Sequence, residues 1–167
     1  MPQVYRVKQR AAWLTNRYGI FEPDGETLLY QLERESFWDA GFTMRDANEN
    51  EVLRITREGI FFHTYRIQSP EGTELAVVEN GGGLFTKTLS LNDGDSQIDV
   101  NGAFLSNEFT FEQGPVQIAT VSKTAWSWSD SYGVEISDYG KPLVILATVA
   151  IIDLVFFEDR GSSSSDS

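Results

Sequence analysis

Apolar and polar residues alternate along short segments of this chain, with the period of two that is typical of half-buried β-strands. Tyr18 and Ile20 lie on one such face, and Phe42 and Met44 lie on the next. The later segments hold Tyr65 and Ile67, Leu89 and Leu91, Phe109 and Phe111, and Tyr132, Val134 and Ile136. Each alternating segment leads into a polar turn that contains Gly, Asn or Asp, residues that tolerate the positive φ of tight hairpins. These turns span 23–25, 46–50, 69–72, 92–95, 113–115 and 137–140.

A second kind of strand recurs at a nearly constant period. Its copies start at residues 29, 52, 75, 97 and 118, so they lie 23, 23, 22 and 21 residues apart. A period of this size is typical of folds that stack or close one supersecondary unit. One strand of the second kind, 4–8, comes before the first unit, and one of the first kind, 132–136, follows the last. The pattern predicts a twelve-stranded antiparallel barrel in which these two half-units pair, because closure removes exposed edges.

Large apolar residues recur between the units, and we interpret them as plugs at the ends of a shared core rather than as a ligand box. They are Trp13, Leu14, Phe37, Trp38, Phe61, Phe62, Leu84, Phe85, Phe104, Leu105, Trp126 and Trp128.

Residues 142–157 break the alternation, because they are apolar on every face and start with Pro142. Proline suits the first position of a helix, although the many Val and Ile residues also fit a strand. A membrane span is a rival interpretation, but the segment is shorter than the roughly 20 residues needed and contains Asp153. A barrel of twelve strands is too wide for its own side chains to fill, so we expect this helix to thread through it. The barrel domain then covers 1–158, followed by a disordered acidic, Ser-rich tail at 159–167.

The charge balance excludes some partners. Lys and Arg number 13 against 25 Asp and Glu, for a net charge of −12 and a pI near 4.4. Such a field repels nucleic acid, so we expect no nucleic-acid partner. The acidity fits two interpretations, surface solubility or adaptation to high internal salt as in a halophile. We see no signal peptide and expect a cytoplasmic protein.

Motifs for catalysis and cofactors are not apparent. The chain has no cysteine and one histidine, His63, and no Ser, His and acid set occurs at a recognisable spacing. Gly81, Gly82 and Gly83 are not followed by the Lys and Ser or Thr of a phosphate loop. We therefore expect a protein that is not an enzyme and needs no cofactor.

Residues 121–136, Val-Ser-Lys-Thr-Ala-Trp-Ser-Trp-Ser-Asp-Ser-Tyr-Gly-Val-Glu-Ile, together with the apolar segment that follows, resemble the signature of the LURP-one-related family. This family belongs to the tubby-like C-terminal domain superfamily and has distant similarity to phospholipid scramblases. The pair Thr124 and Ala125 departs from the bulkier residues expected there. Over about residues 4–158, the resemblance implies a twelve-stranded barrel around a C-terminal helix. It also implies a link to lipids, since tubby proteins bind phosphoinositides and scramblases move phospholipids.

Binding of an anionic headgroup requires clustered Arg or Lys side chains. Arg34, Arg57 and Lys123 occupy equivalent strand ends, and Arg54 and Arg66 lie nearby in sequence. These five residues are the candidate headgroup site. The alternative is that they pair with the abundant carboxylates.

Scramblases carry an acidic segment before their C-terminal helix, and Asp130, Glu135 and Asp138 lie at that place here. The resemblance makes these residues a candidate calcium site. The alternative is that Glu135 and Asp138 face solvent, because calcium requires six to eight converging oxygen ligands.

We therefore expect a non-enzymatic binding or scaffold module of the tubby-like type that associates with membrane lipid headgroups or with another protein, with no oligomeric state specified. The alternatives are a small-molecule-binding or enzymatic barrel and a scramblase-like phospholipid transporter. A polar pocket beside the helix would favour the first alternative, and a helix outside the barrel would favour the second.

Overall fold

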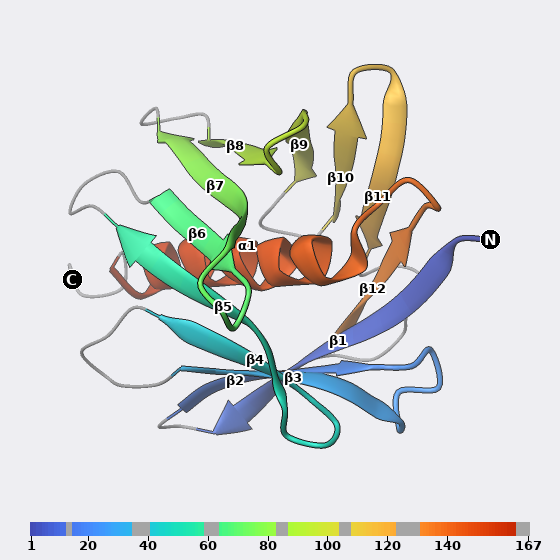
Figure 1. The fold of residues 1–167 in the computed structure, drawn as a ribbon, viewed down its shortest axis with the longest axis vertical. Coiled ribbons are helices and arrows are strands. Elements are labelled where there is room, and N and C mark those ends of the chain that lie inside the picture. The colour runs from blue at the N-terminus through green and yellow to red at the C-terminus, as the bar shows by residue number, and fades with distance from the viewer. Residues whose placement is uncertain are drawn as a thin grey trace.

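The computed structural model describes residues 1–12, 15–34, 41–58, 64–82, 87–103, 108–122 and 131–162. This part of the chain forms twelve β-strands followed by one α-helix (Figure 1). The strands are β1 (Gln3–Ala12), β2 (Thr15–Phe21), β3 (Leu28–Arg34), β4 (Phe42–Asp46), β5 (Glu51–Glu58), β6 (Thr64–Gln68), β7 (Glu74–Gly82), β8 (Lys87–Asn92), β9 (Gln97–Ala103), β10 (Glu108–Gln113), β11 (Val116–Ser122) and β12 (Ser131–Ile136). The helix is α1 (Pro142–Ser162).

Every strand pairs antiparallel with its neighbours in sequence, and the first and last strands close the ring. In the closing pair, Gln3 of β1 lies opposite Ile136 of β12, and Lys8 lies opposite Ser131. The sheet is therefore a closed barrel with no edge strand. The prediction of twelve strands, with the two half-units as each other's partners, is confirmed.

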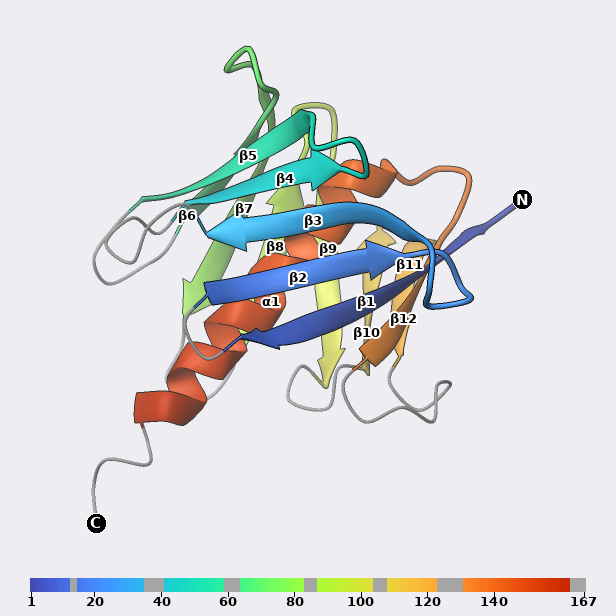
Figure 2. The ribbon, with the colours of Figure 1, turned by 90° about the horizontal axis from the view of Figure 1, so that it is seen from below.

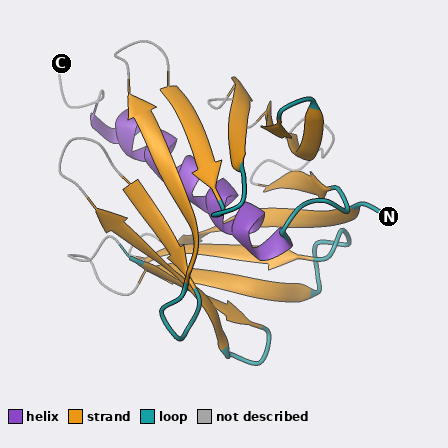
Figure 3. Ribbon diagram, turned by 45° about the horizontal axis from the view of Figure 1, so that its top comes forward, coloured by secondary structure: helices purple, strands orange, loops and turns teal. Residues whose placement is uncertain are grey.

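The helix lies inside the barrel. Residues 144–152 are each at most 6% exposed, and Ala147, Thr148 and Ile151 are 0% exposed. Strand residues of the predicted inward faces, such as Met44, Ile67 and Leu91, are also 0% exposed. Figures 1 and 2 show α1 running through the ring of strands, and Figure 3 shows strands on opposite sides of it. A helix surrounded by strands buries all its faces, which explains why 144–152 has no polar side.

The helix begins at Pro142, as predicted, and ends at Ser162. It continues five residues beyond position 157, where the apolar pattern ends, into the segment that we expected to be a disordered tail. Extension of an existing helix fixes only one residue per added hydrogen bond, so the polar residues can continue it at low cost. The rest of the predicted tail, 163–167, lies outside the described residues. Within the described part of the chain, no helix is long and apolar enough to cross a membrane.

The first five predicted turns lie between strands and the sixth, 137–140, lies between β12 and α1. Most positive φ angles in the turns fall on glycine, as expected. Gly25, Gly72, Gly94 and Gly114 have φ values between +57° and +92°. The turn at 46–50 differs, because its positive φ of 68° falls on Glu49. The Asp46 carboxylate accepts hydrogen bonds from the backbone N–H groups of Asn48 and Asn50, each at 2.9 Å, and so fixes this turn from within. The apolar residues predicted to plug the barrel ends lie outside the described residues.

Candidate functional site

The outer wall of the barrel contains an open groove with a volume of about 490 Å³. Its described lining comes from the end of β5, from β6 to β9, and from the turn between β8 and β9. We call this hollow the outer groove. It lies on the side of the sheet opposite α1, because the residues that alternate with its lining, such as Tyr65, Val78 and Leu91, are buried in the core.

The alternation of side chains along each strand, and the register between strands, place the groove residues next to one another on the outer wall. On β7, Leu75, Val77 and Glu79 alternate with the buried Ala76 and Val78. Strand pairing then aligns their neighbours in two rows across the wall. Arg66, Val77, Asn92 and Gln97 form one row, and Thr64, Glu79 and Ser90 form the next. The groove therefore has a partly apolar floor, formed by Val77 and by Leu75, which also packs against the core, within a polar border.

Arg66 is held by two carboxylates at one side of the outer groove. Its Nε lies 3.0 Å from Glu58 Oε1, and its Nη1 binds Glu74 Oε2. Hydrogen bonds from the guanidinium to Glu58 and then to Glu74, together with their charges, raise the pKa of Arg66. The pairing of the consecutive strands β5, β6 and β7 brings these three residues together. Arg66 contributes one positive charge against the two negative charges that bind it.

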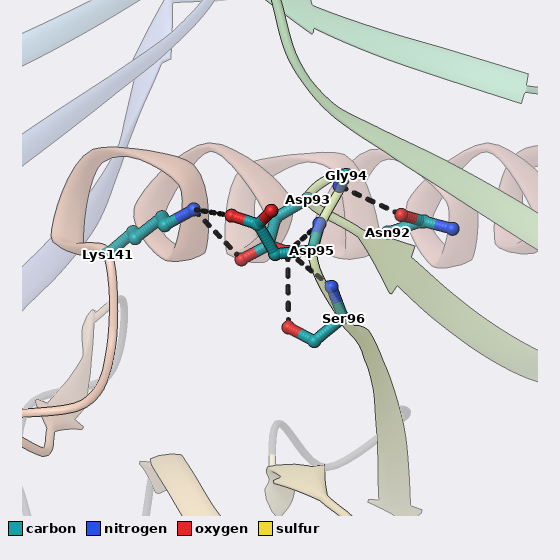
Figure 4. A network of polar contacts seen from close by, with 6 residues as sticks. All are labelled: Asn92, Asp93, Gly94, Asp95, Ser96 and Lys141. Atoms are coloured by element: carbon teal, nitrogen blue, oxygen red, sulfur yellow. Dashed lines mark hydrogen bonds and ion pairs between the residues drawn. The ribbon is translucent and has the colours of Figure 1, made fainter.

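The turn between β8 and β9 forms another border of the groove and is fixed by its own polar contacts (Figure 4). Asp93 Oδ1 accepts hydrogen bonds from Ser96 N at 3.0 Å and Ser96 Oγ at 3.1 Å. Its Oδ2 lies 3.1 Å from Lys141 Nζ, next to the start of α1. Burial alone would raise the pKa of Asp93, but the hydrogen bonds from Lys141 and from Ser96 outweigh it and lower the pKa below its usual value.

The electrostatic character of the outer groove is acidic. Among its described lining residues, Glu58, Glu74, Glu79 and Asp93 carry carboxylates and Arg66 carries the cation. Lys141 offsets the charge of Asp93. Negative charge therefore remains in excess along the groove, within a chain whose net charge is already −12. Chemically, such a hollow suits a ligand that carries positive charge.

The four described residues of the predicted headgroup site lie at two places. Arg54 and Arg66 lie on the outer wall, where Arg54 binds Glu51 and Arg66 binds Glu58 and Glu74. Arg34 and Arg57 continue the inward-facing positions of β3 and β5, at the end of the barrel where α1 ends (Figure 2). Lys123 lies outside the described residues. For Arg54 and Arg66, the structure matches the alternative interpretation, pairing with carboxylates.

Two of the three predicted calcium ligands, Glu135 and Asp138, lie in the described part of the chain. Asp138 binds the N-terminal ammonium of Met1 at 2.8 Å and 2.9 Å, and Glu135 is exposed on β12. Asp130 lies outside the described residues. Within the described ranges, no group of three or more acidic or histidine side chains is arranged to hold a metal ion.

Among the groove residues, Arg66 is part of the candidate headgroup site predicted from the sequence, and the others fall on ordinary strand and turn positions. The signal that could have identified them is the outward row of each predicted strand: Val77 is apolar at a position that faces away from the core. To locate the groove from the sequence, one would also need to know how β6, β7 and β8 are aligned with one another. The alignment of β6 with β7 shifts between Ile67 and Gln68.

The fold defines the class of the protein: a closed twelve-stranded barrel built around a single C-terminal helix, as in tubby-like domains. Residues 3–153 match the sequence profile of the LURP-one-related family, and the chain belongs to that family. The X-ray structure of a protein from Arabidopsis thaliana is similar, with a TM-score of 0.69 and 15% identity over 92% of this chain and 91% of that one. At this identity the likeness supports the fold alone. No curated protein matches the chain.

Proposed function

We propose that this protein is a non-enzymatic binding module whose ligand site is the outer groove. The observation that carries this proposal is the hollow of about 490 Å³ in a wall whose opposite face is fully packed. Its volume falls within the roughly 300–1,000 Å³ that is typical of ligand sites. Side chains from several strands form it, so the rigid barrel holds them in place before a ligand arrives.

The packing of α1 favours a site on the outside over one in the lumen. Helix residues 144–152 are at most 6% exposed, and they lie against strand residues that are equally buried. A ligand beside the helix would have to displace this packing. The outer groove is accessible without any rearrangement of the core.

The chemistry of the groove favours binding over catalysis. Its described lining offers carboxylates, amides and hydroxyls, but four of its five charged residues form ion pairs that hold the wall together: Glu58 and Glu74 with Arg66, and Asp93 with Lys141. A nucleophile with an adjacent base and an orienting third group is the usual arrangement for covalent catalysis. The lining residues that are described do not include that set.

The same pairs weigh against anionic lipid headgroups as the ligand. A phosphate would have to compete with Glu58 and Glu74 for Arg66, and with Glu51 for Arg54. It would also approach a surface of excess negative charge. Membrane association through these residues is thus the less favoured version of a binding function.

A binding screen with a groove-filling variant tests the proposal. The probes are spermine, a basic peptide, inositol hexakisphosphate, and vesicles of phosphatidylcholine with or without phosphatidylserine. Ser90→Trp places a large side chain in the groove without a change of charge, and Thr120→Trp makes the same change on the outer face of β11 as a control.

We expect at least one soluble probe to bind, and Ser90→Trp to weaken that binding at least about tenfold, which corresponds to ~1.4 kcal/mol. Thr120→Trp should leave it unchanged. If no probe binds, or if Ser90→Trp binds as well as the natural chain, the groove is not the ligand site. If the protein co-sediments with anionic vesicles and Ser90→Trp does not change this binding, the result would instead favour association with lipid headgroups.

A further inference from the structure

We infer that the outer groove binds an extended polypeptide segment with a Lys or Arg side chain at every third residue. This inference rests on the proposed function and specifies its ligand. The groove supplies a partly apolar floor, and a line of carboxylates starts in it and continues across the sheet.

The strand register places these carboxylates in one row. Glu58 of β5 lies opposite Thr64 of β6, which lies opposite Glu79 of β7. The row continues through Ser90 of β8 to Asp99 of β9. The acids fall on alternate strands, and the short side chains of Thr64 and Ser90 fall between them along the row. We call Glu58, Glu79 and Asp99 the acidic row.

The spacing of the acidic row follows from sheet geometry. Adjacent strands lie about 4.8 Å apart, so acids on alternate strands are separated by about 10 Å. A chain in the polyproline II conformation has three residues per turn and rises about 3.1 Å per residue, which places every third side chain on one face about 9 Å apart. The two periods match. A β-strand ligand would not match, because its residues i and i+3 point to opposite sides.

The charges along the row are unevenly compensated. Glu58 binds Arg66 at 3.0 Å. At the other end, Asp99 of β9 lies directly opposite Glu112 of β10. Like charges in directly opposed positions destabilise a sheet, so a cation at this end would relieve an existing repulsion. Arg66 shows that this wall can hold a guanidinium between two carboxylates.

The floor contributes to the same preference. Val77 is half-buried on the outward face of β7, and Leu75, which also lines the groove, is half-buried and packs in part against the core. Lys and Arg have long aliphatic stems that pack on apolar surface while their charged ends remain hydrated. A basic side chain crossing Val77 towards Glu79 would use both properties. A compact inorganic cation would use only the charge.

The test measures fluorescence anisotropy of a labelled peptide, (Lys-Pro-Ala)₃, with the full chain at low salt. Proline favours the polyproline II conformation. Two control peptides keep the length: one has the same composition with its three lysines adjacent, and one has Glu in place of Lys. The variants are Glu79→Gln, Asp99→Asn and the double variant, with Glu26→Gln as a control for the loss of one negative charge at an exposed turn. Thermal melting of each variant verifies that it is folded.

We expect the spaced basic peptide to bind most tightly and the acidic peptide not to bind. Each single substitution in the row should weaken binding about threefold to fivefold, as expected for an exposed ion pair, and the double variant about tenfold or more. Glu26→Gln should change it less than twofold. Equal binding of the two basic peptides, or equal losses from Glu79→Gln and Glu26→Gln, would overturn the inference.

These outcomes separate this inference from the proposed function. If Ser90→Trp abolishes binding of another probe while the basic peptide does not bind, the groove is a ligand site and the basic-peptide inference is wrong. If no probe binds at the groove, the proposed function itself fails.

Discussion

Truncation of Ile151, in the middle of α1, should strongly destabilise the barrel. Its side chain is 0% exposed and belongs to the central core. Ile151→Ala removes three carbon groups, worth ~0.8 kcal/mol each, or ~2.4 kcal/mol for burial alone. The closed barrel limits relaxation, so the cavity that remains adds to this cost. We expect a loss of about 3–4 kcal/mol in the free energy of unfolding, and about 1 kcal/mol for Ile151→Val.

Urea unfolding followed by far-ultraviolet circular dichroism measures these losses. The control is Val116→Ala, because Val116 is 43% exposed and its truncation should cost less than ~0.5 kcal/mol. A domain of this size typically has a stability of about 5–15 kcal/mol, so Ile151→Ala should still fold. A loss below ~1 kcal/mol for Ile151→Ala, with an unchanged dependence on urea, would refute the inference that α1 is the packed centre of the barrel.

Three further predictions concern the turn between β8 and β9, a strand glycine and a buried hydroxyl. The lowered pKa of Asp93 means that its carboxylate stabilises the fold above its ordinary pKa of 3.8, and that this contribution is lost as the pH falls through the lower folded value. The stability difference between the natural chain and Asp93→Asn should therefore shrink as urea titrations move from about pH 6 to about pH 3. Gly102 has φ +145°, and a Cβ there would meet the Glu108 carbonyl oxygen at 2.4 Å, so Gly102→Ala should lower stability by ~2 kcal/mol or more in chemical unfolding. Gly72→Ala, with φ +92° but open space around it, should cost only ~1 kcal/mol. Thr148 is 0% exposed and its hydroxyl donates to a helix carbonyl, so Thr148→Val should change the melting temperature little, because apolar replacement of the same shape leaves no unsatisfied donor.

The architecture could be predicted from the sequence because it depends on short-range patterns. Alternation fixed which face of each strand is buried, and Gly, Asn and Asp marked the turns. The strands at 4–8 and 132–136 have no partner within the repeating units, so a closed barrel requires that they pair with each other. The pairing of Gln3 with Ile136 confirms this. The helix followed from a segment that is apolar on every face, which only a surrounded element can satisfy.

The candidate site could not be predicted in the same way, because it depends on contacts between distant segments. Arg66 was a candidate for binding a phosphate, but the register places it next to Glu58, and Glu74 reaches it across a strand pair with a shifted register. The acidic row likewise exists only once β5, β7 and β9 are aligned. Single-sequence patterns give the face of each side chain, whereas the alignment between strands decides its neighbours.

Mapping of the bound peptide onto the chain tests the central claim most directly. A two-dimensional ¹H–¹⁵N correlation spectrum of the full chain, recorded during titration with (Lys-Pro-Ala)₃, reports which backbone amides change their surroundings. Our account predicts saturable shifts at the amides of Thr64, Arg66, Val77, Glu79 and Ser90, with the helix amides of 144–152 unchanged. Shifts confined to Arg34, Arg57 and the end of the barrel where α1 ends, or none at all, would contradict it.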